Sequence, residues 1–181
     1  MPSKGDATWV VSELARRGET LASAESLTGG LVAARIVDVP GASAVFAGGV
    51  VSYQSEVKTH VLGVDQMELQ TLGAVSEGVA IQMATGVRGV LLPGRDVTWG
   101  VATTGVAGPE PDPVGAQPPG IVIIAVCGPD GFVATEKLGF VGEARNQIRH
   151  LTVDFALGLV ERVLRGEEKG ISGGSSGTAG E

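Results

Sequence analysis

Residues 20–37, TLASAESLTGGLVAARIV, contain the pattern that decides the fold. Residues 20–24 are typical of a short strand, and residues 25–30, which end in Gly29-Gly30, indicate a turn. Leu31, Val32, Ile36 and Val37 then recur at helical spacing and predict a helix. A strand, a glycine-rich turn and a helix in direct succession are the repeating unit of α/β proteins.

The rest of the chain continues this alternation. We predict four further strands, over residues 45–53, 97–103, 121–127 and 132–138. We predict further helices from the Asp6 cap to Gly18, from Ser55 to Gly63, from Asp65 to Gly73, from Ser76 onward and over residues 143–164. The apolar run 45–53 is expected to be a buried strand. Its Gly48-Gly49 pair predicts a bulge or a close backbone contact.

This order of elements predicts an α/β fold, a three-layer α/β/α sandwich with a mixed, mostly parallel sheet. We expect one domain over residues 5–165, followed by a flexible Gly/Ser-rich tail over residues 166–181. Because Pro129-Asp130-Gly131 is typical of a hairpin turn, the last two strands should pair antiparallel.

Composition narrows the class of protein. The net charge of −7 and the lack of a basic stripe argue against nucleic-acid binding and mildly favour a cationic ligand. A single cysteine, Cys127, excludes a disulfide within the chain and is expected to be an inert core thiol. We find neither a signal segment nor an apolar run long enough for a membrane span, and therefore expect a cytoplasmic protein with no membrane contact.

Ser26 is the first candidate for chemistry because it follows a predicted strand and precedes a helix. Ligands of α/β sheets collect beyond the carboxyl ends of the strands. Free N–H groups at a helix start suit a phosphate or a developing oxyanion. An ordinary helix-capping serine would show the same pattern. The long loop after Thr104 is the second candidate, since such loops are uncommon in compact domains unless they serve a site.

A serine nucleophile needs a base. His60 and His150, the only histidines, lie within predicted helices away from the glycine-rich turn, and two histidines with one cysteine make a four-ligand zinc site improbable. Lys58 is the remaining base, one turn into the helix that follows Tyr53. A solvated helix lysine is the alternative interpretation.

Taken together, the motifs are more specific than any one of them. AESLTGG (24–30), GVVSY (49–53) with Lys58, LGV (62–64), GAVSE (73–77), TGVAGP (104–109) and Arg145 with Ile148-Arg149 occur in that order. Over about residues 11–163 the chain closely resembles the CinA C-terminal domain family of nicotinamide mononucleotide (NMN) amidohydrolases. Many relatives carry an additional N-terminal domain, and this chain resembles the stand-alone form.

The resemblance implies deamidation of NMN, a pyridine nucleotide, to nicotinic acid mononucleotide and ammonia, without metal or organic cofactor, by a homodimer. It implies Ser26 as nucleophile, with Lys58 and Tyr53 beside it. We expect substrate contacts from Glu25, Thr28, Gly29, Gly30, Thr104, Gly105, Ala107, Gly108 and Arg145. Arg145 would bind the phosphate or form a surface ion pair, Glu25 would position the ribose or Lys58 or serve the structure, and the oxyanion donors would come from Gly29-Gly30 or Gly105.

One segment departs from the family pattern. Residues 110–119, EPDPVGAQPP, replace the glycine pair and lysine that relatives commonly carry, and Gln117 occupies the position of that lysine. The prolines stiffen the loop. Two other functions therefore remain open: a non-catalytic pyridine-nucleotide-binding module, and an amidohydrolase with a different substrate.

Overall fold

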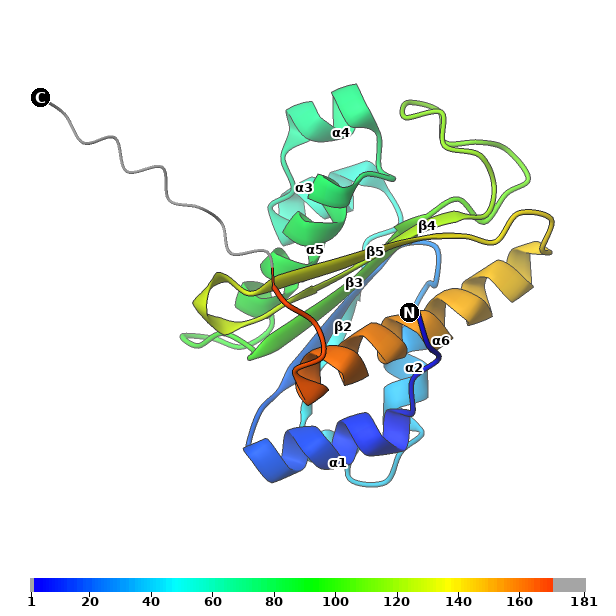
Figure 1. Ribbon diagram of the computed structural model, residues 1–181. Helices are drawn as coiled ribbons and strands as arrows, with labels where there is room; N and C mark the ends of the chain where they lie inside the picture. The colour runs from blue at the N-terminus through cyan, green and yellow to red at the C-terminus, as the bar shows by residue number, and fades with distance from the viewer. Residues whose placement is uncertain (1, 171–181) are drawn as a thin grey trace, which may run out of the picture.

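A five-stranded sheet forms the centre of the fold, which the computed structural model describes over residues 2–170 (Figure 1). The strands lie in the order β2 (Phe46–Val51), β1 (Leu21–Glu25), β3 (Trp99–Gly105), β4 (Ile121–Cys127) and β5 (Val133–Gly139). β1 pairs parallel with β2 and β3, whereas β4 pairs antiparallel with β3 and β5. The predicted mixed sheet is confirmed, with its pairings divided evenly between the two kinds.

Helices cover both faces of this sheet. Figure 1 shows α1 (Ala7–Arg17), α2 (Leu31–Val37) and α6 (Arg145–Arg165) on one side, and α3 (Ser55–Leu62), α4 (Gln66–Leu72) and α5 (Glu77–Val90) on the other. Short 3-10 turns at Ala42–Ala44 and Pro129–Gly131 complete the described elements. The three-layer α/β/α architecture is therefore confirmed. None of the helices within residues 2–170 combines the length and apolar content that crossing a bilayer requires.

Local sequence signals set the helix ends. The Asp6 side chain accepts a hydrogen bond from Thr8 N (2.8 Å), and Gly18 adopts a left-handed φ of 68° after the last turn of α1. Asp65 caps α4 and Ser76 caps α5 in the same way as Asp6. The predicted cap at Ser55 is one residue late, since Gln54 occupies the N-cap position of α3.

β1 is the central strand, and each of its five residues is buried. Leu21 packs into the apolar cluster beneath α1 and α6, whereas Ala22 and Ala24 belong to the cluster beneath α5. The small side chains of β1 let α5 pack closely on the sheet. Alternate residues of one strand thus serve two separate cores, as the two-residue period of a strand requires.

The expectation that residues 45–53 form a buried strand is wrong. β2 lies at the edge of the sheet, and Val51 is 50% exposed. The glycine pair does have the predicted consequence: the register shifts beside Leu21, and a Cβ at Gly49 would lie only 2.4 Å from Ser23 Oγ. The close approach of β2 to β1 therefore depends on glycine at this position.

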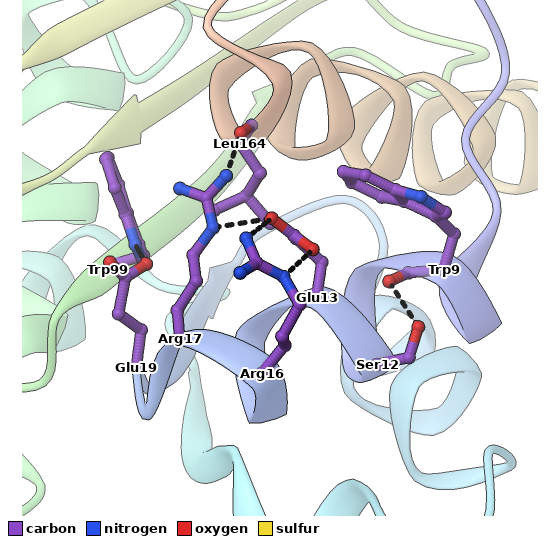
Figure 2. Close-up of polar contacts among 8 residues, drawn as sticks. All are labelled: Trp9, Ser12, Glu13, Arg16, Arg17, Glu19, Trp99 and Leu164. Atoms are coloured by element: carbon purple, nitrogen blue, oxygen red, sulfur yellow. Dashed lines mark hydrogen bonds and ion pairs between the residues drawn. The ribbon is translucent and has the colours of Figure 1, made fainter.

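Polar contacts tie α1 to the rest of the domain (Figure 2). The Glu13 carboxylate accepts hydrogen bonds from Arg16 and Arg17, which lower its pKa to about 2. Arg17 also donates to the carbonyl of Leu164 near the end of α6. The contact between Arg17 and Leu164 links α1 to α6, and Glu13 holds the Arg17 side chain in place for it.

The C-terminal segment begins with ordered contacts. Gly166 ends α6 in a left-handed conformation, and Glu168 forms an ion pair of 2.7 Å with Arg162. The tail that we predict from residue 166 thus starts against the domain. Residues 171–181 lie outside the described residues.

Candidate active site

Ser26 and Lys58 lie in direct contact. Ser26 follows β1, where its N–H donates to the carbonyl of Thr103 on the neighbouring strand (3.0 Å). Lys58 projects from the second turn of α3, and its Nζ donates to Ser26 Oγ at 3.2 Å. Gly30, rather than Ser26, is the N-cap residue of α2, so the capping interpretation of Ser26 is wrong.

The amine of Lys58 is withdrawn from water. The residue is 1% exposed, and Nζ also donates to the carbonyl of Ser52 at 2.5 Å. The ion pairs found within residues 2–170 do not include Lys58. Burial lowers the pKa of Lys58 from 10.5 to about 8 because the charged form loses its hydration. The solvated-lysine interpretation is therefore wrong, and the amine can serve as a base near neutral pH.

A cavity of about 300 Å³ opens beside this pair. Its wall includes Ser26, Tyr53, Lys58, Arg145 and residues 104–108 and 110–113. Both segments that the sequence indicated, the Ser26 turn and the loop after Thr104, therefore meet at one hollow beyond the ends of β1 and β3. Within residues 2–170, no group of three or more His, Cys, Asp or Glu side chains is arranged to hold a metal ion.

Glu25 serves the structure. Its carboxylate is 1% exposed and accepts hydrogen bonds from the N–H groups of Gly30 (2.9 Å), Val32 (3.0 Å) and Ala33 (2.8 Å). The negative charge lies at the start of α2, where the helix dipole and the free N–H groups favour it. Glu25 lies outside the cavity wall, and its hydrogen bonds within residues 2–170 do not include one to Lys58. Its position instead fixes the turn that carries Ser26.

The Thr28-Gly29-Gly30 turn is held by contacts within the fold. The Thr28 hydroxyl is buried against Thr103 Oγ1 at 2.7 Å. The N–H of Gly29 donates to the carbonyl of Ser26 (3.1 Å), and that of Gly30 donates to Glu25. The two N–H groups predicted as oxyanion donors are thus engaged within the fold, and Thr28, Gly29 and Gly30 lie outside the cavity wall. Gly29 and Gly30 adopt left-handed φ values of 61° and 96°, which explains why both positions are glycine.

Arg145 and Tyr53 form a bridge at the rim of the cavity. Arg145 donates to Tyr53 Oη at 3.1 Å and to the carbonyl of Gly108. Tyr53 is 57% exposed and contacts Arg145 instead of Ser26 or Lys58, so a proton relay through Tyr53 is not formed. The ion pairs within residues 2–170 do not include Arg145, and its predicted surface ion pair is absent there. Its positive charge remains available to an anion at the rim.

Comparison with known proteins identifies the family of the chain. Residues 5–164 match the profile of the CinA C-terminal domain. The chain belongs to this family. The resemblance inferred from the motifs is confirmed.

Relatives of the CinA domain share both its sequence and its fold. A CinA-like protein of Frankia casuarinae is 50% identical over 157 residues, which cover 87% of this chain and 34% of the relative, so the chain spans about a third of that protein. Competence/damage inducible protein CihA from Agrobacterium tumefaciens is 34% identical, with a TM-score of 0.79 over 88% of this chain and 93% of its own. A CinA superfamily protein of Escherichia coli is 30% identical, with a TM-score of 0.78 over 87% of each chain.

The loop that departs from the family pattern forms one wall of the CinA cavity. Gly105, Ala107 and Gly108 line the cavity as predicted, and Thr104 lines it while its hydroxyl donates to the carbonyl of Ala74 at 2.6 Å. Gln117 does not: it lines a separate hollow together with residues 71–72, 75–77 and Lys137. The polar side chains that the altered loop brings to the cavity are acidic, from Glu110 and Asp112.

Arg149 is a site residue for which the sequence analysis gave no role. Its Nε donates to the carbonyl of Leu27 (2.9 Å), and its Nη2 donates to that of Thr28 (3.0 Å). This guanidinium holds the Ser26 turn against α6. The sequence did carry a signal for Arg149. Residues four apart on a helix share a face, and Arg145 was already a predicted site residue.

Proposed function

We propose that this CinA domain hydrolyses the carboxamide of NMN to nicotinic acid mononucleotide and ammonia, with Ser26 as nucleophile and Lys58 as general base. The observation that carries the proposal is a buried amine, with its pKa lowered to about 8, that lies 3.2 Å from a serine hydroxyl at a cavity wall. The family resemblance supports NMN as the substrate.

The reaction proceeds through an acyl-enzyme. Neutral Lys58 takes the proton of Ser26 Oγ as this oxygen attacks the carboxamide carbon, and the carbonyl oxygen becomes an oxyanion. Lys58 then gives the proton to the amide nitrogen, the C–N bond breaks, and ammonia leaves an ester on Ser26. Water attacks this ester while Lys58 takes its proton. The proton passes to Oγ as the C–O bond breaks, which frees the carboxylic acid and restores the pair.

Other wall residues have roles that follow from their positions. Gly105 lines the cavity beside Ser26 and is the remaining candidate among the predicted main-chain donors to the oxyanion. Arg145, at the rim, is the candidate for the phosphate, which its planar guanidinium binds through paired hydrogen bonds. Tyr53 holds Arg145 in this place. A homodimer and a cytoplasmic location remain predictions.

An ammonia-release assay on NMN tests the proposal. Ser26→Ala should lower turnover by about a thousandfold. Lys58→Met should lower it by at least about a hundredfold. Lys137→Met, which removes an exposed lysine outside this cavity, is the matched control and should match the parent.

Three results would contradict the proposal. Parental turnover by Ser26→Ala would exclude this residue as the nucleophile. Binding of NMN without ammonia release would favour the non-catalytic module. Release of ammonia from another amide but not from NMN would favour a different substrate.

A further inference from the structure

Asp112 is a buried acidic residue in the wall of the cavity. The residue is 9% exposed although it lies in the proline-rich loop. Its Oδ2 accepts a hydrogen bond from Gly115 N at 2.7 Å. The loop backbone closes around it, since Asp112 N donates to the carbonyl of Gln117 (2.9 Å) and Ala116 N donates to the carbonyl of Asp112 (3.0 Å). The loop therefore holds this carboxylate in one place.

Space for this carboxylate comes from a glycine on the neighbouring segment. A Cβ at Gly73 would lie 2.2 Å from Asp112 Oδ2 and 2.5 Å from Gly115 N. The glycine that ends α4 thus lets the loop pack against it, and Asp112 is seated between the loop and this backbone. Glu110, the other acidic residue of the wall, is exposed, so water screens its charge.

The charge of Asp112 has no protein counter-ion among the ion pairs of residues 2–170. Lys58 and Arg145 supply the positive charges of the cavity wall, and within residues 2–170 their side chains donate hydrogen bonds to Ser26, Ser52, Tyr53 and Gly108. A carboxylate withdrawn from water is favoured by a nearby positive charge. A ligand that enters the cavity with a fixed cationic group would provide one.

We infer that Asp112 is a specificity residue that recognises a cationic ring, so that the site selects amides carried on a positively charged heterocycle over their neutral counterparts. The inference rests on the proposed function, in which the carboxamide lies at Ser26. The ring of NMN is attached directly to that carboxamide and carries a positive charge. A substrate with its carboxamide at Ser26 has its ring in this cavity, whose wall includes Asp112.

Binding of NMN and of its reduced form tests the inference, because the two ligands share the phosphate and the carboxamide but differ in ring charge. The measurements use the Ser26→Ala protein, in which turnover does not interfere. This protein should bind NMN at least about tenfold more tightly than reduced NMN. Adding Asp112→Asn should remove that preference by weakening NMN and leaving reduced NMN unchanged. The asparagine amide oxygen can still accept from Gly115 N, so the thermal midpoint should stay the same.

Asp130→Asn is the matched control, since it makes the same change in an exposed turn outside the cavity wall and should preserve the preference. Equal binding of the two ligands by the Ser26→Ala protein would overturn the inference. So would a preference that survives Asp112→Asn, or failure of NMN to bind. The inference and the proposed hydrolysis can fail separately. If Asp112→Asn removes the preference but the parent protein releases no ammonia from NMN, the inference is supported and the proposed hydrolysis is contradicted.

Discussion

Replacing Lys58 by methionine should make the domain more stable at neutral pH while it abolishes activity. Lys58 is buried without an acidic partner among the described ion pairs, and its pKa is lowered from 10.5 to about 8. Below pH 8 the folded protein holds a proton on this amine at the expense of stability. Methionine fills a similar volume without a charge.

The size of the effect follows from the shift in pKa. Each unit is equivalent to about 1.4 kcal/mol, so the shift from 10.5 to about 8 costs about 3 kcal/mol at pH 7. The unfolded chain binds the proton up to pH 10.5 and the folded chain only up to about pH 8, so this cost is complete below pH 8 and disappears as the pH rises through 10.5. At pH 9 it is about 2 kcal/mol. The variant also loses the hydrogen bonds to Ser52 and Ser26, at a cost of about 1–2 kcal/mol.

Urea denaturation of parent and variant at pH 7 and pH 9 measures the difference. We expect Lys58→Met to be more stable by about 1–2 kcal/mol at pH 7, and this advantage to shrink by about 1 kcal/mol at pH 9. Lys137→Met, at an exposed position of β5, should show no such dependence on pH. A variant that is less stable than the parent by the same amount at both pH values would refute the argument that burial depresses the pKa.

Four further outcomes are expected. The rate constant kcat/KM for ammonia release should rise about tenfold per pH unit up to an inflection near pH 8, because only unprotonated Lys58 accepts a proton; an inflection above pH 10 would contradict this. Gly49→Ala should lower the free energy of unfolding by about 2 kcal/mol or more in urea, since its Cβ would lie 2.4 Å from Ser23 Oγ. Ser52→Ala should change the free energy of unfolding by less than about 1 kcal/mol in the same assay, because its buried hydroxyl finds no hydrogen-bond partner within residues 2–170; a loss of more than about 1 kcal/mol would contradict this. Arg149→Lys should lower kcat about tenfold with an unchanged thermal midpoint, since an ammonium does not reproduce the paired contacts of the guanidinium; wild-type kcat would exclude a positioning role.

Local signals made much of the fold predictable. The caps at Asp6, Asp65 and Ser76 lie where the sequence indicates, and the strand predicted over residues 121–127 has the observed bounds. The burial of β2 was not predictable in this way. Whether a strand lies at the centre or the edge of a sheet depends on strand order, which is set by contacts between segments distant in sequence.

The candidate site was likewise predictable from the sequence only in part. Ser26 and the loop after Thr104 were found because both follow strands whose ends meet. For Glu25 the sequence left a site role and a structural role open, and the strand period turns its side chain toward α2, as the structural role requires. The burial of Asp112 was not predicted, because it results from contacts with the loop backbone that no residue pattern indicates.

The two reacting groups reach the cavity from opposite layers of the sandwich. Ser26 is held by the turn into α2 and by α6 on one side of the sheet, and Lys58 comes from α3 on the other. Detaching either layer would therefore separate the hydroxyl from the amine. If the proposed hydrolysis needs this pair, a partly folded chain with one layer docked would be inert, and activity would return during refolding only when the second layer has packed on the sheet.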